Sequence, residues 1–134
     1  MASTKIIRFF VAVGAVVFAT LASAQGSLDP SNRQELKRSD LSGTNMEVII
    51  SVVEVPPGEL ISRHIHHGEE AFYVLQGATL ELPDGKQVQF ANGMALINPR
   101  DVPHGGVKVV GNTPLKYLAV HVVDKGARLY DAPK

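Results

Sequence analysis

Short runs of β-branched and aromatic residues, separated by turns that contain proline and glycine, follow one another along most of the chain. One of the longest, Met46–Val55, is rich in valine and isoleucine and ends at Pro56-Pro57-Gly58. Residues of this kind favour extended strands, and proline with glycine favours turns. The 3.6-residue apolar spacing of an amphipathic helix does not recur after residue 24. The chain is therefore expected to be an all-β protein.

Further strands are expected in the second half of the chain. Ala78–Leu82 and Lys86–Phe90 flank Pro83-Asp84-Gly85, which suits a short hairpin. The other expected strands are Ala71–Leu75, Met94–Ile97, Val107–Val110 and Leu115–Val123. Many short strands joined by regular turns indicate an antiparallel barrel or sandwich.

The first 24 residues have the pattern of a secretory signal peptide. Lys5 and Arg8 precede an apolar run from Phe9 to about Ala19, and Ala22-Ser23-Ala24 predicts cleavage before Gln25. The alternative, a membrane anchor, is disfavoured because the apolar run is shorter than the roughly 20 residues of a spanning helix. The protein is therefore expected to be exported to the periplasm or secreted, with no membrane attachment after cleavage.

The mature chain is expected to form one domain. Residues 25–45 are polar and read as an N-terminal arm, with room for a short edge strand, and residues 46–134 form the barrel domain. Cleavage leaves 11 basic and 13 acidic residues, a net charge of about −2, without a basic patch. Nucleic acid is therefore not an expected partner. The chain has no cysteine, which excludes disulfides and thiolate metal sites.

Residues 63–77, RHIHHGEEAFYVLQG, concentrate side chains that bind metals. His64 and His66 are two residues apart, so on a strand both imidazoles point to the same face. Glu70 has the same parity, and the break at His67-Gly68-Glu69 can bring its carboxylate back toward the imidazoles. Two imidazoles and a carboxylate suit a divalent first-row metal ion.

The spacing of these residues resembles the cupin superfamily, and in particular its small single-domain, cupin 2 type members. The first cupin motif is matched at every fixed position by Gly58-x5-His64-x-His66-x3-Glu70-x6-Gly77. The second is followed at its glycine, proline and histidine by Gly93-x5-Pro99-x-Asp101-x2-His104. The resemblance covers about residues 46–123. It departs from the family at Asp101, often glycine, and at Lys108, often asparagine; neither position is a metal ligand in the family.

This resemblance implies a jelly-roll β-barrel with a metal ion inside. His64, His66, Glu70 and His104 would bind one divalent transition-metal ion: Fe, Mn, Ni, Cu, Co or Zn. Two further positions on the ion would be left for water, substrate or dioxygen. Glu70 could leave the ion and serve as the catalytic general base. The resemblance also implies a homodimer formed through edge strands and the N-terminal arm.

Other residues near the motifs keep alternative interpretations. His67 is either a solvent-facing loop residue or a proton-transfer group, and His121 is either a hydrogen-bonded core histidine or a residue facing the cavity near the metal. Phe72 and Val74 share the parity of the expected glutamate ligand and would line the cavity, with Gln76 near its rim; the alternative is that they simply form the barrel core.

The leading functional hypothesis is a small metalloenzyme of the dioxygenase type, with a small organic acid, diketone or phenolic compound as substrate. Lyases, decarboxylases and isomerases use the same ligand set. A non-catalytic barrel that binds a metal or a small ligand is the alternative, because no acid or base besides the expected ligands clearly belongs to the cavity. A structural or storage barrel is disfavoured by the intact ligand set.

Overall fold

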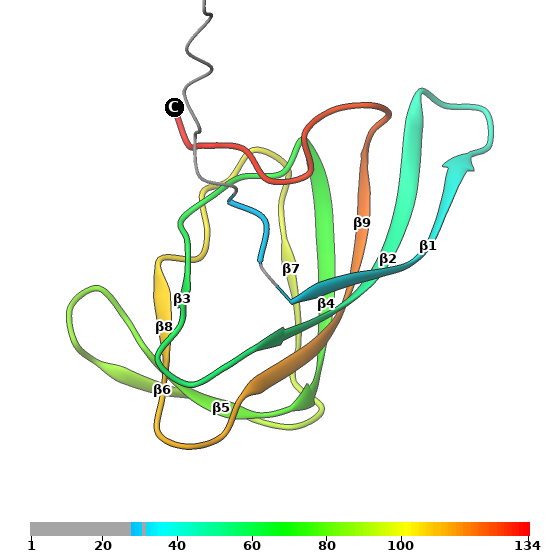
Figure 1. Ribbon diagram of the computed structural model, residues 1–134. Helices are drawn as coiled ribbons and strands as arrows, with labels where there is room; N and C mark the ends of the chain where they lie inside the picture. Colours follow the sequence, from blue (N-terminus) through cyan, green and yellow to red (C-terminus); the bar gives the residue numbers. More distant parts are fainter. Residues whose placement is uncertain (1–27, 31) are drawn as a thin grey trace, which may run out of the picture.

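The computed structural model describes residues 28–30 and 32–134, which form nine β-strands (Figure 1). The strands are β1 (Arg33–Leu41), β2 (Met46–Val55), β3 (Leu60–Ile61), β4 (Gly68–Gln76), β5 (Ala78–Glu81), β6 (Gln87–Phe90), β7 (Ala95–Asn98), β8 (Val107–Val110) and β9 (Leu115–Asp124). These residues contain no helix, which confirms the predicted all-β class. In the described part of the chain there is accordingly no helix capable of crossing a membrane. The predicted signal peptide lies outside the described residues.

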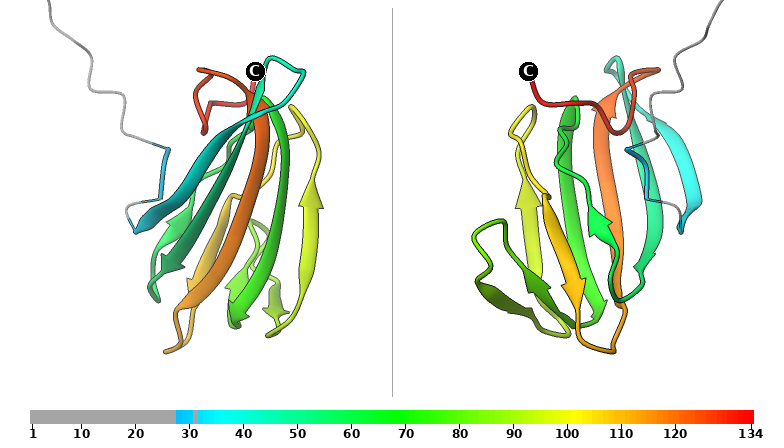
Figure 2. Two further views of the ribbon diagram at one scale, coloured as in Figure 1. Left: turned by 90° about the vertical axis from the view of Figure 1, so that its right-hand side faces the viewer. Right: turned by 60° about the vertical axis from the view of Figure 1, so that its left-hand side comes forward.

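The strands form two antiparallel sheets. One sheet has the order β1-β2-β9-β4-β7 and the other the order β3-β8-β5-β6. The left view of Figure 2 shows the five-stranded sheet in front of the four-stranded one. Strands that are distant in sequence are neighbours in each sheet, as expected for a jelly-roll barrel. Buried residues from both sheets belong to one core cluster, so the two sheets enclose a common interior.

Local sequence signals located most strands correctly. The predictions Met46–Val55 and Val107–Val110 have the observed bounds, and the hairpin of β5 and β6 is present. β1 is a nine-residue edge strand, longer than the short one allowed for. The stretch with His64 and His66 is not a regular strand, however: β3 ends at Ile61, and only isolated bridges follow.

The interior is built from alternating residues of the long strands. Along β9 every second residue is buried, beginning with Leu115, Tyr117 and Ala119. β2 alternates in the same way and pairs with β9 along its whole length. With residues such as Leu80 and Val109 from the four-stranded sheet, these side chains form one apolar core cluster. The hydrophobic effect therefore holds the two sheets together at this end of the barrel.

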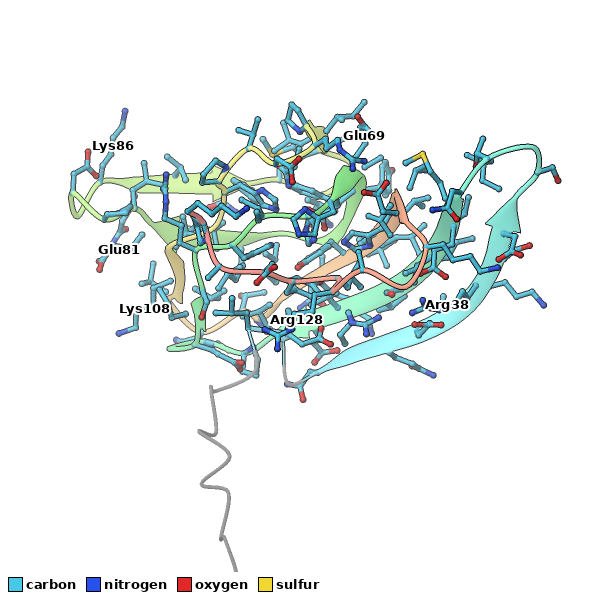
Figure 3. All side chains as sticks on the ribbon, turned by 90° about the horizontal axis from the view of Figure 1, so that it is seen from above. Arg38, Glu69, Glu81, Lys86, Lys108 and Arg128 are labelled. Atoms are coloured by element: carbon cyan, nitrogen blue, oxygen red, sulfur yellow. The ribbon has the colours of Figure 1, made fainter. Side chains whose placement is uncertain are left out.

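The C-terminal segment closes the other end of the barrel. Figure 3, seen from above Figure 1, shows this segment crossing over the interior, while labelled charged side chains such as Arg38, Lys86 and Lys108 lie at the periphery. Ile65 and Asp131 exchange backbone hydrogen bonds of 2.9 and 3.1 Å. The Tyr130 side chain is consequently buried, with 7% of its surface exposed.

Candidate metal centre

His64 and His104, one from each motif, lie side by side at the closed end of the barrel. The His64 amide donates to the His104 carbonyl at 2.9 Å, and the His104 amide donates back at 3.0 Å. Gly105 permits this approach, because its φ is +77° and an added Cβ would lie 2.5 Å from the Ser62 carbonyl oxygen. Backbone pairing, rather than a continuous strand, therefore brings the two motifs together.

Asp101 occupies the turn that delivers His104. Its φ is +57°, in the left-handed region where aspartate is tolerated better than most residues. A glycine would adopt the same conformation without strain. The Asp101 amide donates to the His66 carbonyl at 2.9 Å, and its Oδ1 lies 2.7 Å from Nδ1 of His67. The departure from the motif thus leaves the turn intact and ties it to the first motif.

Each of the three motif histidines is held through Nδ1 by a backbone carbonyl oxygen. Nδ1 of His64 is 2.6 Å from the Ser62 oxygen, and Nδ1 of His104 is 2.9 Å from the Val102 oxygen. Nδ1 of His66 makes the corresponding contact with the Leu129 oxygen on the C-terminal segment. A proton on Nδ1 leaves the Nε2 lone pair free, which is how neutral histidines are usually presented to metals.

Glu70 faces these free nitrogens. Its Oε2 lies 3.4 Å from Nε2 of His66 and 3.4 Å from Nε2 of His104. For metal–ligand bonds of about 2.1 Å, neighbouring donors are about 3.0–3.4 Å apart. The ligand atoms of His64, His66 and His104 lie within 4.8 Å of one another, as do those of His66, Glu70 and His121. The spacing of the donors therefore fits a metal ion.

Several nitrogens of the cluster are buried without a hydrogen-bond partner. Among the described residues these include Nε2 of His66, Nε2 of His104 and both ring nitrogens of His121. Leaving a buried polar atom unsatisfied costs about 1–3 kcal/mol. A metal ion accepting the lone pairs of His66 and His104 would offset that cost, so the chemistry of the donor set also fits a metal.

The ionisation of the cluster is set by burial and by one carboxylate. Burial lowers the pKa of His64 to about 4. Burial opposes ionisation of Glu70, but contacts from the surrounding histidines outweigh it and lower the pKa of this carboxyl. Burial works against the His104 cation, yet the Glu70 carboxylate and a backbone carbonyl raise its pKa above the ordinary value. Without a metal, the Glu70 carboxylate therefore favours the protonated form of His104 more than solvent would.

A cavity of about 210 Å³ adjoins the cluster. His64, Glu70, Asn98 and His104 supply its polar side chains. The remaining wall is mainly apolar and consists of Ile61, Phe72, Leu80, Phe90, Leu96, Gly105, Val107, Leu115 and Tyr117. The site thus combines a few convergent polar groups with an apolar wall, as small-molecule sites commonly do.

Of the three residues expected to line the interior beyond Glu70, only Phe72 lies at the cavity. Val74 is buried in the core cluster, as the alternative interpretation from the sequence expected. Gln76 is not among the residues that line this cavity; its side chain is exposed, and its amide donates to the Pro114 carbonyl at 2.9 Å. A register shift between Val74 and Gln76 interrupts the alternation, so Gln76 no longer shares the face of Glu70.

The two remaining histidines have different surroundings. His67 is partly exposed, and its ring nitrogens contact Asp101 at 2.7 Å and Asp131 at 3.4 Å, so it links the turn to the C-terminal segment. His121 is fully buried, with Nε2 3.4 Å from Oε1 of Glu70. It is a core histidine and is not among the residues that line the adjoining cavity, and among the described residues its nearest charged neighbour is the Glu70 carboxylate.

Three groups that contact the proposed ligands were not predicted from the sequence. Asn98 Nδ2 donates to Oε2 of Glu70 at 2.7 Å. The Tyr130 ring centroid is 4.8 Å from the centroids of His64 and of His66. The third contributor is the Leu129 carbonyl described above. The position of Asn98 just before Pro99 of the second motif was a usable signal, whereas nothing local marks Leu129 or Tyr130.

Comparison with known proteins agrees with this geometry. A family model described as the cupin domain matches residues 51–121. The chain is 30% identical over 80 residues to the oxalate-binding protein of Thermotoga maritima, a match spanning 59% of this chain and 65% of that protein. It is 28% identical over 85 residues to the dimethylsulfoniopropionate lyase DddW of Ruegeria pomeroyi, spanning 61% and 56%. The matches therefore cover less than two thirds of both relatives.

Solved structures with the same fold include proteins of several kinds. The polyketide cyclase RemF from Streptomyces resistomycificus superposes with a TM-score of 0.50 and 28% identity, covering 66% of this chain and 62% of that one. An uncharacterised protein with a double-stranded β-helix domain from Klebsiella pneumoniae gives a TM-score of 0.51 at 23% identity, covering 81% and 98%. At that identity the second likeness shows the fold alone.

Proposed function

Because the chain belongs to the cupin domain family, we propose that it binds one divalent transition-metal ion and acts on a small organic molecule beside that ion. The proposed ligands are His64, His66, Glu70 and His104, and the ion is Fe, Mn, Ni, Cu, Co or Zn. One observation carries the proposal. Three imidazoles are held through Nδ1 by backbone carbonyls, and Nε2 of His66 and of His104 face one carboxylate oxygen.

The proposed activity is oxygenase-like, with a small organic acid, a diketone or a phenolic compound as substrate. The ion would supply Lewis acidity and, if it is redox-active, a route for electrons. The apolar wall contributed by Phe72, Leu80 and Leu115 would exclude water and limit the substrate to the cavity of about 210 Å³. The Asn98 amide would orient a polar substrate group, and Glu70 is the proposed general base.

A barrel that binds its ligand without turnover is the second candidate. Apart from Tyr117, whose phenol has a pKa raised by burial, the polar side chains that line the cavity are three of the proposed ligands and Asn98. One relative is named for binding oxalate and another as a lyase. The alternatives to oxygenation at this site are therefore binding without turnover and a lyase, decarboxylase or isomerase reaction.

The first test is the metal content of the untagged protein purified from its native compartment. About one equivalent of iron, manganese, nickel, copper, cobalt or zinc is expected, measured by elemental mass spectrometry. His64→Ala and His104→Ala should each lose it. Metal that stays at the same level in both variants, or none in the native protein, would refute the proposed site.

The second test separates turnover from binding. Oxygen uptake is measured on metal-loaded protein with a panel of diketones, phenolics and small organic acids, and oxalate binding is measured by calorimetry. Turnover should disappear in Glu70→Gln and persist in Glu69→Gln, because Glu69 is exposed on the adjacent position of the same strand. Oxalate binding without oxygen uptake or product formation would favour the binding barrel.

Export is a separate part of the proposal. Residues 1–24 are proposed to be a cleaved signal peptide, supported by the basic start, the apolar run and the Ala22-Ser23-Ala24 site. The mature protein would then be periplasmic or secreted. Sequencing the N-terminus of protein recovered from the cell envelope or medium should give Gln25 as the first residue, and an intact Met1 would contradict export by cleavage.

A homodimer is also proposed, with contact through β7. β1 and β7 are the two edges of the five-stranded sheet. β1 carries charged residues at most positions, whereas β7 exposes Leu96 and Ile97, the latter 68% exposed. Charges discourage edge pairing, so an uncharged edge facing a second copy of itself is the better match. Light scattering should report a dimer that Ile97→Lys converts to a monomer; a wild-type monomer would exclude it.

A further inference from the structure

Glu70 lies between two polar residues on neighbouring strands. In the register of the five-stranded sheet, Glu70 on β4 is directly opposite Asn98 on β7 and directly opposite His121 on β9. Residues opposite one another in adjacent strands point to the same face of a sheet. The three side chains therefore form a row across β7, β4 and β9, turned toward the barrel interior.

Each oxygen of the Glu70 carboxylate faces a different member of this row. Asn98 Nδ2 donates to Oε2 at 2.7 Å. Nε2 of His121 lies 3.4 Å from Oε1. Glu70 and His121 are 4% and 0% exposed, so water does not compete for these positions. The oxygen facing the histidines of the proposed metal site is Oε2, and the oxygen facing His121 is Oε1.

We propose that Asn98 and His121 form a carboxylate clamp, defined as the two positioning residues that fix the orientation of Glu70 for the metal. Asn98 holds Oε2 from one side, and His121 donates Nε2–H to Oε1 from the other. Rotation of the carboxylate is thereby restricted before an ion arrives, and Oε2 stays directed at the imidazole nitrogens. The inference rests on the proposed metal site, and it assigns roles to two residues outside its ligand set.

The structure distinguishes His121 from the proposed ligands. The three motif histidines each have Nδ1 anchored on a backbone carbonyl, whereas neither ring nitrogen of His121 has an aligned partner. A second ion between Glu70 and His121 would lack donors, because His66 has only one free nitrogen once Nδ1 is committed to the Leu129 oxygen. The contact with Oε1 is therefore assigned to positioning, and the test below distinguishes this role from metal ligation by His121.

The test measures metal binding and coordination rather than activity. Protein freed of metal is titrated with Co(II) to obtain affinity, and the imidazoles bound to Cu(II) are counted by pulsed electron paramagnetic resonance. His121→Leu should bind Co(II) about 10–100-fold more weakly, the usual effect of losing a group that orients a ligand. His121→Gln, which keeps an N–H donor, should recover most of the affinity. The count should stay at three imidazoles in both variants.

Asn98 provides a second arm of the same experiment. Asn98→Leu removes the donor to Oε2 and should weaken Co(II) binding by a similar factor. Val123→Ala is the matched control for lost packing, because Val123 is buried two residues from His121 on the same face of β9. Its thermal stability should fall while its Co(II) affinity stays within about threefold of wild type. Circular dichroism establishes that each variant is folded.

The outcomes separate the clamp from the metal site. Loss of Co(II) binding in His64→Ala, with wild-type affinity in His121→Leu and Asn98→Leu, would refute the positioning role of the clamp and support the proposed metal site. Should the imidazole count fall by one in His121→Gln, His121 is itself a ligand and its positioning role is refuted. No Co(II) binding by the wild-type protein would instead remove the proposed function on which the clamp rests.

Discussion

The two ends of the barrel interior are built from the same strands but differ in chemistry. The apolar end consists of core residues such as Leu80, Val109 and Leu115. The metal end consists of His64, His66, Glu70, His104 and His121. β9 contributes to both, with Leu115 at its start and His121 six residues later on the same face. A single alternating strand therefore runs from a packed core into a polar site.

The ends also differ in how their buried atoms are satisfied. Side chains of the apolar end have nothing to satisfy beyond packing, and their burial is favourable at about 25 cal/mol per Å². The metal end holds buried nitrogens without hydrogen-bond partners. Burial of apolar side chains at the other end offsets the free-energy cost of these unsatisfied nitrogens. A bound metal would offset a further part of it. The apolar packing and the metal-binding groups are thus at different ends of one interior, and Leu80 and Leu115 line the cavity between them.

Among the changes considered, removal of the metal is expected to have the largest effect on the free energy of unfolding. At a metal concentration about 1,000 times Kd, binding to the native state alone adds about 4 kcal/mol to the free energy of unfolding. The melting temperature should rise by more than about 10 °C when the ion that the native protein carries is added to chelated protein. His104→Ala should show no such rise. An equal rise in that variant would mean the ion stabilises the fold from elsewhere.

Shortening a buried side chain at the apolar end is expected to have the second-largest effect on the free energy of unfolding. Leu80→Ala removes a fully buried side chain and should lower the free energy of unfolding by about 3 kcal/mol. The gain in stability on adding metal should remain as in wild type, because Leu80 belongs to the apolar core cluster and is not one of the proposed ligands. Chemical denaturation with and without metal checks both statements. A metal gain that shrinks along with stability would show the two ends to be coupled.

Acid should release the metal in a defined order. Because the pKa of His104 is raised and that of His64 is lowered, protons compete with the ion at His104 at a higher pH than at His64. His64, with a pKa of about 4, competes only near that pH. Affinity measured between pH 7.5 and 4 should fall at least about tenfold per unit once His104 titrates. Affinity that is flat down to pH 5 would contradict this.

Tyr130→Phe is expected to have the smallest effect. The Tyr130 hydroxyl is buried without a hydrogen-bond partner among the described residues, whereas its ring packs on His64 and His66. Removing only the hydroxyl should leave the unfolding free energy unchanged or raise it by about 1 kcal/mol. Metal affinity should also be unchanged. Weaker metal binding in this variant would show that the Tyr130 hydroxyl contributes to the metal site.

Local sequence determined much of the fold and part of the site. Alternation and β-branched residues located Met46–Val55 as a strand because backbone preference and burial act within a few residues. The same two-residue parity grouped His64 and His66, and motif spacing added Glu70 and His104. The tolerance of aspartate for a left-handed turn was also foreseeable at Asp101.

Only the tertiary structure decided what surrounds those residues. Asn98 and His121 flank Glu70 because of the register of β4 with β7 and β9, and register between strands distant in sequence is set by the packing of the whole interior. The contacts of Leu129 and Tyr130 likewise depend on where the C-terminal segment crosses the barrel. The sequence by itself determined which side chains can bind a metal; three-dimensional packing decided which groups orient them.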